Sequence, residues 1–386
     1  MLLACLADAV GLPPPTVDEP AAPVRWSVVE EKARAHGVLL YLTAAPAEVR
    51  IPHGLLMRAQ QERLHATQRN LFLAAELVRL TAAFGAAAVD ARAFKGPVAG
   101  VRLYGDLSRR PSGDLDLMVP EHQWMHAAEV LAAAGYESGS IHPNSLQGSF
   151  WHPAKHLPVD LHWGLPPKRF GFDTRALFAG QETVSLLGQA IPTFTQSDTL
   201  LIAAINAIKV VHDVSLRGLL DVAACLGRLQ APDWRAARRR ARQLGCERFL
   251  LVAAHACWKL FGDRFDTRIL RDCRSHRAIS RAGDEVVWQI VDRCNPAPQM
   301  YVLASERSYH RSLSSRRVQG ARLLRRAVVP TESDTSCLRL PRSLEFLYLV
   351  LRPVRLSLKY GTRALRRSNG PRRDKSQAGD WPTGQG

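Results

Sequence analysis

The chain lacks the cysteine spacing of a zinc ribbon or of a disulfide-stapled domain. Its 386 residues include 7 cysteines, an odd number scattered from Cys5 to Cys337, and no C-x-x-C occurs. A set of this kind favours a reducing compartment over a disulfide framework. We therefore expect a cytoplasmic protein.

Long apolar runs and a leader-like N-terminus are also missing. No stretch of about 18 uncharged apolar residues occurs, so no membrane span is expected. Met1-Leu-Leu-Ala-Cys-Leu6 has no basic residue before its short apolar run, which argues against a secretory signal. Hydrophobic residues make up 46% and charged residues 23% of the chain. These are globular values, and they exclude a wholly disordered or collagen-like protein.

Positive charge is what the chain has in excess, with 52 Lys and Arg against 35 Asp and Glu. Residues 301–386 hold 18 of those basic residues and 6 of the acidic ones. A basic tail of this kind is typical of contact with a nucleic acid or an anionic membrane surface. Its apolar segment 344–359 either docks on the protein or lies at a membrane, which would make the protein peripheral there.

Periodicity and composition divide the chain into five segments. The pattern predicts helices over 26–42, 52–84, 98–104 and 121–134, strands over 87–94, 113–119 and 157–163, and a hairpin over 183–192. We expect a flexible N-terminus over 1–25, N-terminal helices over 26–86, an α/β core over 87–196, a helical domain over 197–340 and a basic, partly disordered tail over 341–386.

Carboxylates gather on two predicted strands of the core. Asp114 and Asp116 are two residues apart on one strand and so project from the same face, and Asp160 lies on another strand. Neighbouring carboxylates repel unless a cation lies between them, and oxygen ligands suit Mg²⁺. A third carboxylate would complete a two-metal site for phosphoryl chemistry.

Phosphate-binding features precede these carboxylates. Lys95-Gly96 stands at a predicted strand-to-helix junction, where glycine admits close approach of a phosphate to the backbone and the helix offers unpaired N–H groups. Lys95 adds a cationic contact. Arg110, four residues before Asp114, is placed to clamp developing charge.

Taken together, these residues resemble a known family. Phe94-Lys-Gly-Pro97, Leu103-Tyr-Gly-Asp106, Arg110-Pro-Ser-Gly-Asp-Leu-Asp-Leu-Met-Val119 and Val159-Asp-Leu-His-Trp163 are similar to the bacterial uncharacterised nucleotidyltransferase family of the polymerase-β-like nucleotidyltransferase superfamily. The similarity extends more loosely over residues 26–230. It implies an α+β fold, with a small mixed-sheet nucleotidyltransferase core, N-terminal helices and a helical C-terminal domain.

The resemblance also implies roles for single residues. Asp114 and Asp116 would hold two Mg²⁺ ions, and Asp160 would bind the catalytic metal and help activate the acceptor hydroxyl. Lys95 and Gly96 would contact the triphosphate. The superfamily's usual glycine–serine pair appears here as Lys95-Gly96, so the phosphate contact through a serine hydroxyl is lost.

Auxiliary residues have two alternative interpretations each. His162, on the strand face of Asp160, either reaches the metal site or bonds a neighbouring carboxylate. His212, Arg217 and Asp221 follow one another at spacings of five and four residues on a predicted helix, and the last two are the pair of interest. They either form an ion pair or contact the base or acceptor.

The function expected is Mg²⁺-dependent transfer of a nucleoside monophosphate from an NTP, such as ATP, to an acceptor, with Mn²⁺ as the alternative metal. The acceptor is a small molecule, a peptide or a protein. Two other functions stay open. One is a catalytically inactive nucleotide-binding or scaffold subunit, and the other is a glycosyltransferase whose D-x-D motif binds a nucleotide-sugar.

Overall fold

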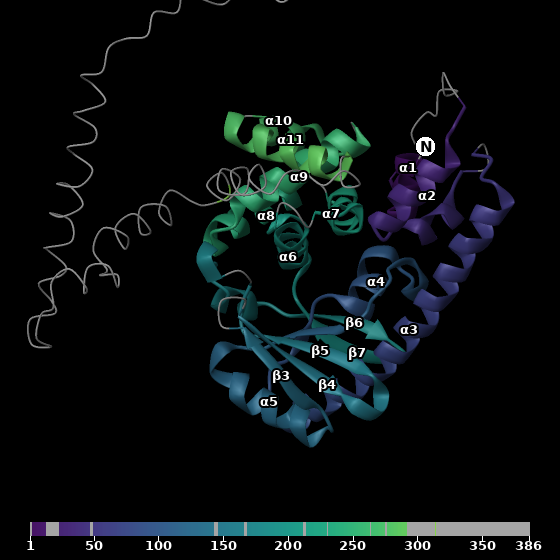
Figure 1. Ribbon diagram of the computed structural model, residues 1–386. Helices are drawn as coiled ribbons and strands as arrows, with labels where there is room; N and C mark the ends of the chain where they lie inside the picture. Colours follow the sequence, from purple (N-terminus) through teal and green to yellow (C-terminus); the bar gives the residue numbers. More distant parts are fainter. Residues whose placement is uncertain are drawn as a thin grey trace, which may run out of the picture. The chain divides into compact units, whose positions relative to one another are not determined.

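The structure of the chain is a computed structural model, and Figure 1 shows its helices and strands. It describes residues 2–12, 23–46, 49–142, 146–165, 168–210, 214–229, 231–262, 264–274, 276–291 and 313. His212, most of the predicted helical stretch beyond residue 291 and the whole basic tail over 341–386 lie outside the described residues.

Helical segments precede the sheet. They are α1 (Leu2–Ala9), α2 (Trp26–Ala35), the 3-10 helix η1 (Leu39–Ala44) and α3 (His53–Ala86). The expected single helix over 26–42 is wrong, because α2 ends before Gly37, whose φ of 63° is left-handed. Part of the stretch 1–25, expected to be flexible, forms α1, which buries Cys5 and Leu6.

A five-stranded mixed sheet forms the α/β core, in the order β1-β2-β5-β4-β3. Its elements are β1 (Arg92–Ala93), α4 (Gly96–Tyr104), β2 (Leu115–Met118), α5 (Trp124–Ala133), β3 (Glu137–His142), β4 (Gln147–His152) and β5 (Leu157–His162). β2 and β5 are parallel, and the other neighbouring strands are antiparallel. The sequence does not predict β3 and β4. All of β3 is exposed, so it shows no apolar alternation.

Alternation along β2 and β5 decides which side chains enter the core. Leu115 and Leu117 of β2 pack with Val159 and Leu161 of β5 in one hydrophobic cluster. Buried residues of the C-terminal half of α3, from Leu73 to Phe84, and of α5 belong to the same cluster, and Figure 1 shows the long helix α3 running beside the sheet. The intervening residues of both strands therefore project from the opposite face of the sheet.

A hairpin and a helical region follow. β6 (Glu182–Leu186) and β7 (Gln189–Thr193) form the expected hairpin, with Leu187 and Gly188 at positive φ in its turn. The helices are α6 (Gln196–Ile208), α7 (Leu216–Gly227), α8 (Ala231–Leu244), α9 (Glu247–Phe261), α10 (Thr267–Arg274) and α11 (Arg277–Val291). Their core is continuous with Ala99 and Leu103 of α4, which ties this region to the sheet.

This architecture confirms the expected fold class, a small mixed sheet between N-terminal helices and a helical C-terminal region. Short 3-10 helices occur at Leu107–Arg109, Glu121–Gln123, Pro153–Lys155, Lys168–Phe170 and Arg175–Ala179. Within the described part of the chain, every helix is too short or too polar to span a bilayer.

Candidate active site

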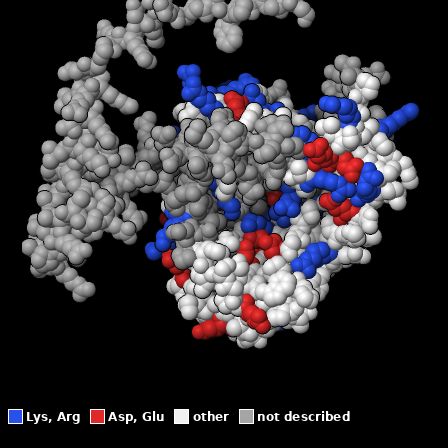
Figure 2. Space-filling view, in the orientation of Figure 1, with Lys and Arg blue, Asp and Glu red and all other residues white. Residues whose placement is uncertain are grey.

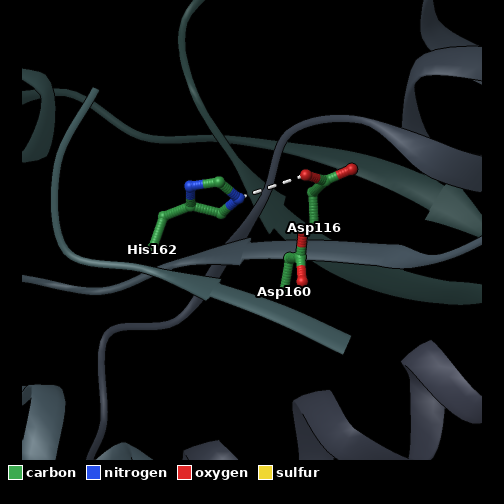
Figure 3. Close-up of side chains that lie close together, drawn as sticks. All are labelled: Asp116, Asp160 and His162. Atoms are coloured by element: carbon green, nitrogen blue, oxygen red, sulfur yellow. Dashed lines mark hydrogen bonds and ion pairs between the residues drawn. The ribbon is translucent and has the colours of Figure 1, made fainter. Parts of the chain in front are cut away.

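The register of β2 and β5 places two predicted carboxylates side by side. Asp116 and Asp160 are partners in the parallel pair, so their side chains are neighbours on one face of the sheet. His162 joins them, and one ligand atom from each of the three residues lies within 4.8 Å of the others. Figure 3 shows the imidazole facing the Asp116 carboxylate, with Asp160 beside it.

Asp116 is the buried centre of this cluster, with its side chain 5% exposed. Its Oδ1 accepts hydrogen bonds from Lys95 Nζ at 2.6 Å and from His162 Nε2 at 3.2 Å. Burial alone would raise the pKa of Asp116, but Lys95 and His162 outweigh it and hold the pKa well below its usual range. Asp116 is therefore ionised near neutral pH.

The second of the two roles expected for His162 is the one that the geometry shows, a bond to a neighbouring carboxylate. Because an ionised carboxylate only accepts hydrogen bonds, Nε2 of the ring carries the proton. Burial lowers the pKa of His162, so the ring is neutral. Its buried Nδ1 has no hydrogen-bond partner among the described residues.

Neutral donors on β4 hold Asp160. Ser149 Oγ donates to Oδ1 at 2.8 Å, and Gln147 Nε2 donates to Oδ2 at 3.1 Å. The sequence patterns predict neither donor, because they do not predict β4. The alternation of the polar residues Gln147 and Ser149 with Gly148 and Phe150 is the sequence signal that would place them.

Asp114 stands just before β2, apart from the Asp116–Asp160–His162 cluster. It is half-buried and lines the same cavity as Asp116. Burial raises the pKa of Asp114, and repulsion by Asp116 and Asp160 raises it further. Asp114 is therefore repelled by the two neighbouring carboxylates of the site.

A cavity of about 540 Å³ opens in front of these carboxylates. Its walls come from α4, the loop before β2, and helices α6 and α7, and its size suits a small-molecule ligand. Figure 2 shows acidic and basic side chains next to each other in the hollow of this face. The cations that line the cavity are Arg34, Lys95, Arg110, Lys209 and Arg217. Asp160 lies beside Asp116 rather than in the cavity wall.

Lys95 and Gly96 begin helix α4 at the edge of this cavity. Gly96 has a φ of 58°, and a Cβ there would lie 3.3 Å from the carbonyl oxygen of Asp114. Glycine therefore lets the junction pass close to the start of β2. The Lys95 side chain is 25% exposed and lines the cavity, so an anion at the helix N-terminus would meet its ammonium group.

Arg110 is already engaged by a residue of the helical region. Its Nε and Nη2 donate to the Asp221 carboxylate at 2.9 to 3.1 Å, and Tyr104 Oη donates to the same group at 2.8 Å. Contact of Arg110 with a nucleotide stays a prediction.

The expected ion pair between Arg217 and Asp221 is wrong, because Asp221 faces Arg110 instead. Arg217 is exposed at the cavity, and within the described ranges it forms no hydrogen bond or ion pair. A base- or acceptor-contacting role for Arg217 is the alternative that remains.

Comparison with known proteins gives one family. Residues 22–262 match the family described as "Uncharacterised nucleotidyltransferase". A solved structure that resembles the chain is that of an antigenic nucleotidyltransferase-like protein from Paracoccidioides brasiliensis. It is 16% identical, the match covers 44% of this chain and 87% of that one, and the TM-score is 0.30, too low to carry an argument. No curated protein matches.

Proposed function

This chain belongs to the family of uncharacterised nucleotidyltransferases, and on that premise we propose that it transfers a nucleoside monophosphate from an NTP to an acceptor hydroxyl. The observation that carries the proposal is the pairing of Asp116 with Asp160 across two parallel strands, with Lys95 beside them at a cavity. Carboxylates on adjacent strands next to a cationic helix start suit two-metal phosphoryl chemistry.

The donor set fits Mg²⁺, with Mn²⁺ as the alternative. Carboxylate oxygens are the ligands that both ions prefer, and a divalent cation would relieve the repulsion of Asp114 by Asp116 and Asp160. We assign Asp114, Asp116 and Asp160 as the ligands of two ions. Bound metal supplies charge neutralisation at the phosphates and a lowered pKa of the attacking hydroxyl.

Residues of the chain itself bind the donor and move the proton. Lys95 and the backbone at Gly96 hold the triphosphate at the start of α4. The acceptor oxygen forms a bond to the α-phosphorus as the bond from that phosphorus to the β-bridging oxygen breaks. Pyrophosphate leaves with the bridging oxygen. The hydroxyl proton passes to a carboxylate oxygen of Asp160 and from there to water.

ATP is the donor to test first, and the other three NTPs follow. The acceptor is a small molecule, a peptide or a protein. We also propose a reducing, cytoplasmic location. The cysteines free and buried in the described part of the chain, which support it, are Cys5, Cys225, Cys246, Cys257 and Cys273.

A second candidate is a catalytically silent nucleotide-binding subunit of a biosynthetic assembly. Two predicted nucleotide-binding cations support it, because Lys95 and Arg110 are each paired with a carboxylate of the chain itself. A D-x-D glycosyltransferase is the third, and no contact in the described residues favours it over the others.

Pyrophosphate release separates these functions. The protein is incubated with each NTP and Mg²⁺ while small-molecule, peptide and protein acceptors are supplied in turn. We expect acceptor-dependent release that Asp116→Asn and Asp160→Asn abolish and that Glu76→Gln, a buried carboxyl outside the site, preserves. NTP binding without release for every acceptor would favour the silent subunit. Turnover of a nucleotide-sugar without turnover of any NTP would favour the glycosyltransferase.

A further inference from the structure

We infer that Lys95 is a resident counter-cation of the site, one that leaves Asp116 when metal binds and moves to the phosphates that arrive with the metal. This inference rests on the proposed function. Its observation is the ion pair of 2.6 Å between Lys95 Nζ and Asp116 Oδ1, inside the carboxylate cluster that would hold the metal.

Electrostatic repulsion prevents the Lys95 ammonium group and a metal ion from sharing Asp116. Asp116 is 5% exposed, and Lys95 and His162 already share its Oδ1. An ammonium group and a divalent cation on one buried carboxylate would repel strongly, because charges are poorly screened away from water. Asp160 differs, since Ser149 and Gln147 hold it with neutral groups. Lys95 is therefore the cation that metal must displace from this cluster.

The Lys95 ammonium group can reach a second anionic partner in the cavity. The side chain of Lys95 is 25% exposed and lines the cavity, and a lysine stem is flexible enough to carry the ammonium between two partners. It is also the N-cap of α4, where its side chain makes no capping bond that would tie it down. A triphosphate at this helix start would offer it a second anionic partner.

Metal and triphosphate should therefore bind cooperatively. Metal alone displaces Lys95 and leaves the ammonium without a partner, whereas metal with triphosphate gives it a new one. Cooperativity of this kind is a coupling free energy between two ligands, and it disappears when the residue that couples them is removed.

The test is a calorimetric titration with two probes, Mn²⁺ alone and inorganic tripolyphosphate in the presence of saturating Mn²⁺. Wild type is compared with Lys95→Met and Lys95→Gln, and Lys95→Arg restores the charge. Lys155→Met is the matched control. Lys155 pairs with Glu76 at 2.7 Å, with side chains 30% and 6% exposed, so it resembles the Lys95–Asp116 pair outside the site. Far-UV circular dichroism confirms that each variant folds.

We expect Lys95→Met and Lys95→Gln to change the two affinities in opposite directions. Mn²⁺ alone should bind about tenfold more tightly than to wild type, and tripolyphosphate about tenfold more weakly, which lies within ordinary coupling strengths. Lys95→Arg should stay near wild type for both probes. Lys155→Met should change neither affinity.

Unchanged or weaker Mn²⁺ binding in folded Lys95→Met would overturn the inference. If wild type nevertheless binds Mn²⁺ and Asp116→Asn does not, the proposed metal site survives and only the role of Lys95 fails. If no variant binds Mn²⁺ at all, the proposed function and the inference fail together.

Discussion

A neutral imidazole orients the central carboxylate of the site. His162 donates from Nε2 to Asp116, and burial keeps the ring uncharged, so it positions Asp116 without adding a positive charge that would oppose a metal. Partners of this kind fix ligand orientation in metal sites. We therefore propose that His162 is a positioning residue.

Replacing His162 with Phe removes the donor and keeps an aromatic ring. We expect the affinity for Mn²⁺ to fall about 10- to 100-fold, the usual effect of losing an outer partner of a ligand. His162→Gln keeps an N–H donor, so its affinity for Mn²⁺ should lie between those of wild type and His162→Phe. Equal Mn²⁺ affinities in folded wild type and His162→Phe, measured by calorimetry, would contradict the positioning role.

Gly96 has a left-handed backbone conformation where the start of α4 passes close to Asp114. Gly96→Ala forces a side chain into a left-handed conformation and brings its Cβ against the backbone of Asp114, so unfolding free energy should fall by about 1–2 kcal/mol. Gly85→Ala is the control. Gly85 is exposed near the end of α3, and an added methyl group there would meet open space, so this change should stabilise by up to about 1 kcal/mol. Urea denaturation measures both, and the same sign for both would be inconsistent with this geometry.

Between elements, a largely buried ion pair joins the loop before β2 to helix α7. The Arg110 and Asp221 side chains are 11% and 12% exposed, and Asn70 Nδ2 donates to the carbonyl oxygen of Arg110 at 2.7 Å. The loop that leads to Asp114 is thus held from both α3 and α7. The Arg110–Asp221 pair therefore connects the helical region to the loop that carries Asp114.

Breaking this pair from one side should be costly. Asp221→Ala leaves the Arg110 guanidinium buried without its partner, and we expect the free energy of unfolding to fall by about 3–5 kcal/mol. Lys259→Ala is the comparison, because Lys259 and its partner Asp284 are 43% and 54% exposed, and about 1 kcal/mol or less is at stake in such a surface pair. Chemical denaturation of both variants checks the contrast. Similar losses of unfolding free energy in the two variants would contradict a large contribution of the Arg110–Asp221 pair to stability.

Glu76 of α3 links that helix to the segment between β4 and β5. Burial alone would raise its pKa, but hydrogen bonds from Arg79, Lys155 and Tyr136 outweigh burial and lower the pKa to about 2 from an ordinary 4.5. A lowered folded-state pKa stabilises the fold above the unfolded value. This stabilisation is complete above about pH 4.5 and is lost as the pH falls toward 2.

Glu76→Gln should therefore lower the unfolding free energy by about 2–3 kcal/mol at pH 7, with the difference from wild type shrinking between pH 4.5 and 2. Thermal unfolding across this range measures it. Glu129→Gln, an exposed carboxyl on α5, should follow wild type throughout. A difference for Glu76→Gln that grows at low pH would contradict the sign of the shift.

Sequence patterns predict elements unevenly, for physical reasons. In β2 and β5, Leu115, Leu117 and Val159 alternate with polar residues, so the strands and the common face of their carboxylates can be predicted. The exposed strand β3 carries no such signal. The partner of Asp221 cannot be predicted from the sequence either. Helical spacing points to Arg217, whereas tertiary packing brings Arg110 to Asp221 from a distant loop.

In the fold as a whole, the α/β core and the helical region form the cavity together. Its walls include α6 and α7 of the helical region, so the α/β core alone supplies the carboxylates and the start of α4 but only part of the binding surface. Motifs in the sequence predict the carboxylates. They do not predict the opposite wall, because residues that line a cavity across two regions share no local pattern.

The excess of positive charge in the C-terminal part of the chain is the second property of the whole molecule. Deleting residues 316–386 removes 16 Lys and Arg and 5 Asp and Glu, and we predict that this deletion weakens binding to single-stranded RNA or to anionic vesicles at least about tenfold at low salt. Cosedimentation with vesicles and fluorescence anisotropy with RNA distinguish the two partners. Equal binding by the deleted chain to both would contradict a role for the tail, and metal binding at Asp116 should be unaffected.

The assignment of Asp116 and Asp160 can be checked by calorimetric titration with each of the four NTPs, in the presence and in the absence of Mg²⁺. The wild type should bind at least one NTP only when Mg²⁺ is present, and Asp116→Asn/Asp160→Asn should lose that binding while Glu76→Gln keeps it. Folded wild type that binds no NTP, or a double variant that binds as well as wild type, would contradict the assignment of these carboxylates as the metal site of a nucleotidyltransferase.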